Sequence, residues 1–358
     1  MPKKATRRRT RKQRRSKSRK GRGTRGSRRT NLTISHGRIR YRPRPGTTPH
    51  TFSTLMAQRM LHTQRAHRLS GVKLCKRMRV PRQHSANCWL NAAIMSLFVS
   101  NGMHRATAPI RHALINPPQT LAPTLRRELR QLGLAIHSVP LGILGEQYST
   151  AKLIPALVAA DRAGLTTPRN RLGAPQGTAH NPVWFFTALA SLLLPLEYSI
   201  RHVDLSKPGG KPYPDLKTAL AVGTHRNATH NSAPPHLLLI EAGQETADTK
   251  VRTELSNAIT SSGTIRALGR RWRIDSIAML DTTDSHFGGV ITCNATPHTY
   301  DGITGSHVHD KRTWREVMDR LVNHPIPTPS REEFRYDVRT GYVVFAFVPI
   351  PSSSGRHR

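Results

Sequence analysis

The chain has 358 residues, which is enough for one large domain or two of ordinary size. It carries 57 Lys and Arg against 20 Asp and Glu, a net charge of +37, and only 36% of its residues are hydrophobic, so part of it is not expected to form a globular core. Three cysteines without a CxxC pair exclude a disulfide-rich scaffold and a zinc ribbon, and they favour a reducing compartment. The longest apolar run, 184–196, is shorter than the roughly 20 residues of a membrane span, so a membrane protein is not expected. A secreted protein is not expected either, because the N-terminal charges run on to Arg44 without the apolar stretch of a signal peptide.

The first 50 residues form a basic arm. They contain 20 Lys and Arg and no acidic residue, and the first acidic residue of the chain is Glu128. Such a segment repels itself and buries little apolar surface, so we expect it to be disordered when free. Its charge favours a nucleic-acid partner bound through phosphates without sequence specificity, and its one aromatic residue, Tyr41, leaves little scope for base stacking. A nuclear-localisation signal is the alternative interpretation, and an anionic membrane is disfavoured because the arm has no apolar anchor.

The remaining sequence predicts a folded domain with short flanks. We interpret residues 51–80 as a basic linker or an amphipathic helix, residues 81–350 as the domain, and residues 351–358 as a disordered tail. Helices followed by strands indicate an α+β fold with an antiparallel sheet. The predicted helices lie near 88–100, 123–132, 151–163, 182–194 and 313–322, and the predicted strands at 236–241, 271–280, 287–293, 298–302 and 341–348.

Cys88 opens the clearest helix. The run CWLNAAIMSLFVS is apolar on nearly every face and is therefore expected to be buried. A thiol at a helix N-terminus lies at the positive end of the helix dipole, which favours the thiolate and hence a nucleophile. Taken alone, a cysteine on an apolar helix is more often a small core residue. Its partners decide between the two interpretations.

His286 and Asp301 are the candidate partners. A nucleophilic thiol needs a base, and the base needs an acceptor on its second ring nitrogen. His286 precedes one predicted strand and Asp301 ends the next, so a hairpin that turns near Cys293 and Asn294 would bring them side by side. The sequence therefore predicts a catalytic triad of Cys88, His286 and Asp301.

Four segments resemble those of ubiquitin-specific proteases, a branch of the papain-like cysteine peptidases. The segment SANCWLNAAIMSLF resembles the family's Cys box, SHFGGVITC with HTYDG resembles its His box, PPHLLLIE resembles the strand upstream of that box, and GYVVFAFV resembles the closing strand. They span about 81–350 in the family's order of Cys, His and Asp. The resemblance implies a papain-like fold, with a helical subdomain followed by a β-sheet subdomain, and cleavage after the C-terminus of ubiquitin or a ubiquitin-like protein.

The resemblance also implies further site residues. Gln83 stands five positions before Cys88, where the family has its oxyanion donor, and Trp89 and Phe287 would flank a narrow channel for a Gly-Gly tail. Packing in the core is the alternative for both aromatic residues. The chain lacks the family's usual Asn-x-Gly-Asn before the nucleophile and its finger-type CxxC pairs, so the catalytic centre is supported better than ubiquitin as the substrate.

We therefore expect a thiol hydrolase without a cofactor or metal, tethered to nucleic acid by its arm. The His-x-His-Asp cluster at 307–310 offers too few ligands at useful spacing and is interpreted as a surface loop. The alternatives are a cysteine protease that processes viral or host proteins, and a non-enzymatic nucleic-acid packaging protein with a degenerate protease fold. By analogy, the combination fits a virion-associated deubiquitinase of a eukaryotic DNA virus, found in the nucleus or cytoplasm of the host cell or in the virion.

Overall fold

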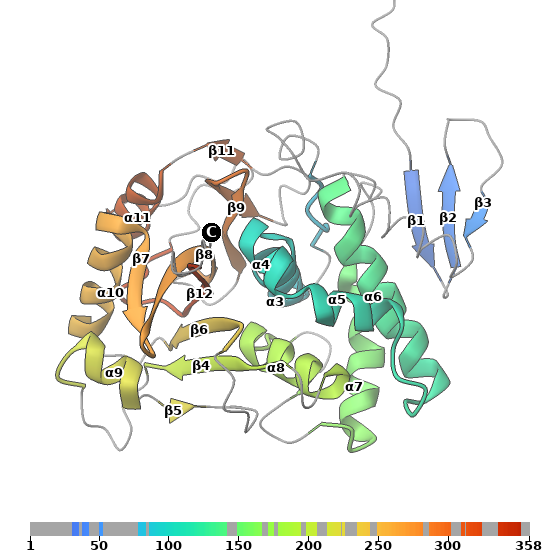
Figure 1. Cartoon of the computed structure of the whole chain (residues 1–358). Coiled ribbons are helices and arrows are strands. Elements are labelled where there is room, and N and C mark those ends of the chain that lie inside the picture. Colours follow the sequence, from blue (N-terminus) through green and yellow to red (C-terminus); the bar gives the residue numbers. More distant parts are fainter. Residues whose placement is uncertain are drawn as a thin grey trace, which may run out of the picture.

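The structure of the chain is a computed structural model (Figure 1). Apart from three strands before residue 53, all of its described elements lie between Cys88 and Pro349. The structure describes residues 31–35, 38–42, 50–52, 78–83, 86–141, 149–166, 171–174, 178–194, 198–205, 213–222, 224–225, 235–243, 249–281, 286–301, 309–311, 313–323 and 336–351.

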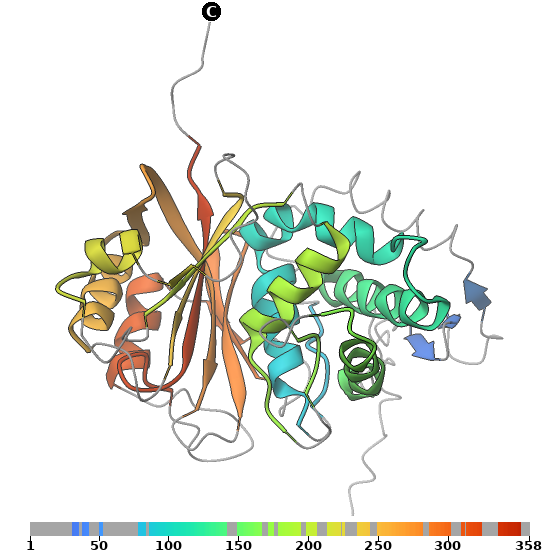
Figure 2. The ribbon, with the colours of Figure 1, turned by 90° about the horizontal axis from the view of Figure 1, so that it is seen from below.

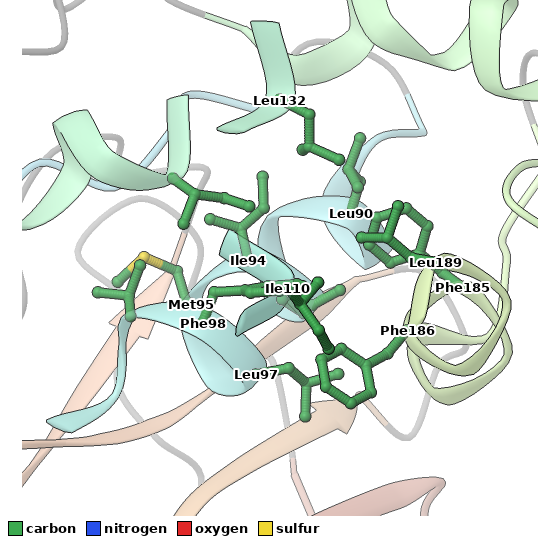
Figure 3. Packing of buried hydrophobic residues seen from close by; sticks show 14 of the residues in the cluster. Leu90, Ile94, Met95, Leu97, Phe98, Ile110, Leu132, Phe185, Phe186 and Leu189 are labelled. Atoms are coloured by element: carbon green, nitrogen blue, oxygen red, sulfur yellow. The ribbon is translucent and has the colours of Figure 1, made fainter. Parts of the chain in front are cut away.

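Helices make up the first lobe. Every residue of α3 (Cys88–Ile94) is buried, and the helix continues as a π-helical turn, η1 (Met95–Val99). A helix without a polar face must lie inside the protein, so the continuous apolar sequence explains this position. Phe98 of η1 packs against Phe186, with ring centroids 5.3 Å apart (Figure 3). The other helices of this lobe are α4 (Asn101–Ala106), α5 (Ala108–Ile115), α6 (Pro123–Leu141), η2 (Thr150–Leu153), α7 (Ile154–Arg162) and α8 (Pro182–Leu193).

A mixed sheet of nine strands forms the second lobe. The strand order is β11-β10-β9-β8-β12-β6-β4-β5, and β7 also pairs with β8. All of the neighbouring strands are antiparallel except β4 and β6, so the predicted purely antiparallel sheet is wrong for this pair. The chain between them passes through α9 (Leu216–Val222), and a parallel pair needs such a crossover. The strands are β4 (Ile200–Asp204), β5 (Thr224–His225), β6 (Leu237–Ala242), β7 (Thr264–Ala267), β8 (Arg270–Leu280), β9 (Phe287–Cys293), β10 (Thr296–Asp301), β11 (His309–Lys311) and β12 (Val343–Pro349).

The sheet lies between two hydrophobic cores, and Figure 2 shows helices on both of its faces. Successive side chains of a strand point to opposite faces. On β8, Ala278 accordingly packs with the helical lobe, whereas Ile277 packs with the cluster that includes α10 (Thr249–Ser262) and α11 (Trp314–Asn323). The helical lobe therefore covers one face of the sheet, and α9, α10 and α11 cover the other.

A buried carboxylate connects the two lobes. Asp275 on β8 accepts hydrogen bonds of 2.8 Å from the backbone N–H groups of Gly102 and Met103. These groups belong to the first turn of α4, where a helix has donors without an internal acceptor. Burial raises the pKa of Asp275, and the two N–H groups oppose this shift. The contact fixes the helical lobe against the strand that leads to His286.

The basic arm is not irregular throughout. Residues 31–52 contain three antiparallel strands, β1 (Asn31–Ser35), β2 (Arg38–Arg42) and β3 (His50–Phe52). The register places Leu32 opposite Tyr41 and Ile34 opposite Ile39, so apolar positions alternate together along both strands. The expectation that the arm is disordered when free stays a prediction. Residues 1–30, the possible amphipathic helix before residue 77 and the tail after residue 351 lie outside the described residues.

Candidate active site

Cys88 begins α3 at the junction of the two lobes. The side chain is buried and its thiol is free, and α3 packs against β9. The backbone N–H groups of Leu90 and Asn91 bond to the carbonyl oxygen of Asn87, which closes the first helical turn directly around the thiol. The predicted helix start at Cys88 is therefore the one found.

A buried amide network holds this helix start in place. The Asn87 side-chain amide donates to Thr150 Oγ1 at 2.8 Å, and the Thr150 hydroxyl donates to Asn91 Oδ1 at 2.6 Å. The Asn91 amide donates in turn to the carbonyl oxygen of Pro81 at 3.0 Å. The network joins the segment before Cys88, the first turns of α3 and the distant η2. Sequence reasoning gave no role to Asn87 or Thr150, because their contact spans 63 residues.

His286 is placed by a carboxylate at the end of β8. The backbone N–H of His286 donates to Asp281 Oδ1 at 2.9 Å, and the Asp281 N–H donates to the His286 carbonyl oxygen at 2.9 Å. Both side chains are buried. The two bonds close the ends of the connection between β8 and β9, so the imidazole leaves the sheet from a fixed backbone position. This contact gives Asp281 a positioning role.

A tight hairpin brings Asp301 to His286. Asn294 and Ala295 form its turn with φ of 54° and 64°, and Asp301 pairs with Gly288 across β9 and β10. This turn is the one the sequence predicted. His286 Nε2 and Asp301 Oδ1 are 2.6 Å apart and both side chains are almost fully buried.

Tyr300 fixes the strand that carries Asp301. Its hydroxyl lies 2.9 Å from Ser96 Oγ and donates to the Ala92 carbonyl oxygen at 3.3 Å, so β10 is bonded directly to α3 and η1. β9 lies so close to Tyr300 and to β8 that it needs glycine at this point, since a Cβ added at Gly289 would overlap Ile277 and Tyr300. The Gly-Gly pair after the predicted histidine therefore has a steric explanation.

The imidazole of His286 interacts with both other members of the predicted triad. Burial acts to lower its pKa, but hydrogen bonds and charge from Asp301 and from Cys88 outweigh burial and raise the pKa to about 9. An imidazole with this pKa is protonated at neutral pH. The structure therefore brings the three residues together: His286 is hydrogen-bonded to Asp301 and interacts electrostatically with Cys88.

Trp89 and Phe287 are both buried and pack against other aromatic rings. Trp89 is fully buried, and its ring lies edge-on to His180 at 4.9 Å and to Phe185 at 5.6 Å. Phe287 is 4% exposed and packs against Tyr342 at 5.8 Å. Both residues therefore pack in the core, the alternative considered for them, because each lies on an element that is itself buried. The predicted channel role stays a prediction.

Gln83 is half-buried in the segment before α3. Its side-chain oxygen Oε1 is buried and forms no hydrogen bond with any residue that the structure describes. The predicted oxyanion role stays a prediction.

Two other predictions concern cysteines and metals. Cys293 is disulfide-bonded, which differs from the expectation of reduced cysteines, whereas Cys88 is free. Among the described residues, no three His, Cys, Asp or Glu side chains gather as a metal site, and the side chains of 307–310 lie outside that part of the chain. The described helices also include none that is both long and apolar enough to span a membrane.

Known proteins offer distant likenesses. No protein-family model matches the chain, and no curated protein matches it. An essential yeast splicing factor is similar in structure at 11% identity, with a TM-score of 0.44, over 88% of this chain and 85% of that chain. The SAGA DUB module of Ubp8, Sgf11, Sus1 and Sgf73 is similar at 9% identity, with a TM-score of 0.36, over 83% of this chain and 74% of that chain. The same module bound to monoubiquitin gives 9% identity and a TM-score of 0.35 over 84% and 75%.

Proposed function

We propose that the chain is a thiol-dependent hydrolase with a papain-like catalytic centre. The observation that supports this proposal is the placement of the His286 imidazole, which lies 2.6 Å from Asp301 and interacts electrostatically with Cys88. A free thiol at a helix start, a base within reach and a carboxylate that orients the base are the parts that covalent thiol catalysis requires. They come from three separate segments of the chain, and buried contacts hold each of them.

The chemistry follows from the protonation states. The Cys88 thiolate attacks the carbonyl carbon of the scissile bond, a C–S bond forms, and the carbonyl electrons move to oxygen. The His286 imidazolium gives its proton to the departing amine as the C–N bond breaks. Neutral His286 then takes a proton from water, which attacks the thioester and releases the carboxylic acid and the thiolate. Asp301 keeps the ring oriented and favours its protonated form.

The negative charge on oxygen needs donors near Cys88. The first N–H groups of a helix have no acceptor within the helix, so the Cys88 N–H is a suitable donor. We assign the second donor to the Gln83 amide. Donors aimed at the oxyanion are among the largest contributions to acyl-transfer catalysis.

We propose that the scissile bond is the peptide or isopeptide bond after the C-terminus of ubiquitin or a ubiquitin-like protein. This finer assignment rests on the likeness of the Cys88, His286 and Asp301 segments to the boxes of ubiquitin-specific proteases. A protein-processing cysteine protease would use the same centre, so the substrate needs its own experiment.

Ubiquitin carrying a C-terminal electrophile is the appropriate probe. The wild type should form a covalent adduct that peptide mapping places on Cys88, and Cys88→Ala should form none. Adduct formation that survives Cys88→Ala would exclude the nucleophile. If no ubiquitin-like probe reacts but Cys88 still reacts with small electrophiles, the processing-protease alternative is favoured. An inert Cys88 would favour the packaging protein.

We further propose that the basic arm binds nucleic acid. The support is its 20 positive charges without an acidic residue, which suit phosphate neutralisation, and a nuclear or virion location would accord with such a partner. Deleting residues 1–50 should remove most nonspecific binding at low salt and leave hydrolysis intact. Unchanged binding would contradict this division, and nuclear import that fails without any loss of binding would favour the localisation signal.

A further inference from the structure

A groove lies at the end of the sheet lobe remote from Cys88. Its volume is about 1010 Å³, and it is bordered by α9, by the β7–β8 hairpin and by the chain after β12. In Figure 1, α9 lies beside the end of β7 where the hairpin turns. Four of the side chains that line the groove are basic and none is acidic: Lys217, Arg266, Arg270 and Arg271.

The hairpin register concentrates positive charge. Arg266 on β7 stands directly opposite Arg271 on β8, and both side chains are exposed. Like charges directly opposite on antiparallel strands destabilise a sheet. The next exposed position along β8 is Arg273, so the charge continues beyond the groove. The residues that alternate with these arginines along β8, such as Trp272, face the core, and their burial stabilises the fold. The opposed arginines therefore do not serve the fold.

Within the described part of the chain, no carboxylate forms an ion pair with Arg266, Arg270 or Arg271. Lys217 is different, because its charge helps to lower the pKa of the neighbouring Asp215. Arg270 is held in place by protein groups instead: its guanidinium lies 5.2 Å from the centre of the Trp272 ring, and it donates to the Pro235 carbonyl oxygen at 3.3 Å. A fixed guanidinium loses less conformational entropy when it binds an anion.

The groove is separate from the catalytic centre. β8 starts with Arg270 at the groove and ends with Leu280, next to the Asp281 that positions His286. At about 3.3 Å per residue, its 11 residues place the two sites roughly 30 Å apart. A ligand in the groove therefore does not occupy the substrate position beside Cys88.

The residues that line the groove indicate which class of ligand it binds. The planar guanidinium group of arginine matches the geometry of phosphate oxygens. No aromatic residue lines the groove for base stacking, and no Asn or Gln lines it for base-edge recognition. We propose that this groove binds the phosphate backbone of a nucleic acid without reading its sequence. It is a second contact, built on the folded lobe and independent of the arm. An acidic peptide or an anionic membrane would meet the same charges, and the experiment distinguishes them.

The test compares two charge-matched variants of the full-length chain. Arg266→Gln/Arg271→Gln removes two groove charges, and Arg315→Gln/Arg320→Gln removes two charges from α11 on the same lobe. Binding to a labelled 20-base-pair duplex is measured by fluorescence anisotropy across a salt series. Because each lost phosphate contact changes the slope of log K against log salt by about 0.9, the groove variant should have a slope shallower by about 1.8 and the α11 variant a slope close to wild type.

Two further readouts complete the test. Hydrogen exchange of residues 264–273 should slow when the duplex binds the wild type, and labelling of Cys88 by the ubiquitin probe should be unchanged in both variants. Equal slope changes in the two variants, or no protection at 264–273, would overturn the proposal. So would a groove variant that loses binding to polyglutamate or phosphatidylserine vesicles and keeps duplex binding.

Discussion

His286 depends on its two neighbours for its charge state. Asp301 and Cys88 raise its pKa against the effect of burial, so the imidazolium is the resting form at neutral pH. The carboxylate is therefore expected to act through the ring, on its protonation as well as on its orientation.

Asp301→Asn should lower the pKa of His286 from about 9 towards its ordinary value of 6.5. The amide keeps a hydrogen-bonding group and loses the charge. Because the folded pKa exceeds the unfolded one, Asp301 contributes stability that is complete below pH 6.5 and is lost as pH rises through 9. NMR titration of the imidazole and urea unfolding at pH 6 and pH 9.5 measure both effects. A His286 midpoint that does not move in the variant would contradict the coupling.

Gln83 is expected to act only in the transition state. Gln83→Ala should reduce kcat by 10²- to 10³-fold, about 2.7–4 kcal/mol, and leave KM nearly unchanged. Gln83→Asn serves as a control that keeps the amide on a shorter side chain. Steady-state kinetics on a ubiquitin fluorogenic substrate give the two constants, and urea unfolding shows whether both variants fold. A wild-type kcat in Gln83→Ala would remove Gln83 from the mechanism.

The start of α3 depends on a contact with another element. No side chain caps the helix at Asn87, and the amides of Asn87 and Asn91 are instead joined through Thr150 of η2. The position of the Cys88 thiol is therefore determined by residues about 60 positions away.

Thr150→Val should lower the free energy of unfolding by about 1–3 kcal/mol, because it leaves buried amide groups without a partner. The side chain is nearly unchanged in shape, so packing is preserved. Thr150→Ser retains the hydroxyl and should keep most of the stability. Urea unfolding measures the difference, and the rate of Cys88 modification reports the position of the thiol. Equal stability of the two variants would show that the network contributes little.

The elements that the sequence predicted share a strong local signal. The apolar run after Cys88, the turn at Asn294 and the strand at 343–349 are each readable from neighbouring residues. Local patterns do not predict α4, α5 or β4, because Gly102 and scattered basic residues obscure their periodicity. The parallel pairing of β4 with β6, and the roles of Thr150 and Asp281, depend on contacts between distant segments. Local patterns do not contain that information.

At the scale of the whole molecule, different histidines make the stability of the fold depend on pH in opposite directions. Burial, with the charge of Arg111, lowers the pKa of His104 to about 3 and that of His137 well below 6.5. Both side chains must stay neutral in the folded helical lobe, whereas His286 in the proposed catalytic centre is favoured when charged.

The stability of the domain should therefore be greatest near pH 6.5. Between about pH 3 and 6.5 the unfolded chain binds protons that His104 and His137 exclude in the folded state, so stability falls as pH decreases. Above pH 6.5 the contribution of His286 is lost as pH rises towards 9. Urea unfolding from pH 4 to 9.5 gives the profile, His104→Gln should flatten its acid side, and Asp301→Asn should flatten its alkaline side. Stability that rises steadily across this range would contradict the assignment.

The catalytic proposal for the whole molecule requires the thiol of one lobe and the imidazole of the other to act together. The rate of Cys88 carbamidomethylation at pH 6, followed by peptide mapping in the wild type and in His286→Ala, tests this most directly. An ordinary thiol is almost entirely protonated at this pH, so a thiolate held by the imidazolium should react at least about tenfold faster in the wild type than in the variant. Equal rates in the two proteins would show that Cys88 and His286 do not form a catalytic pair.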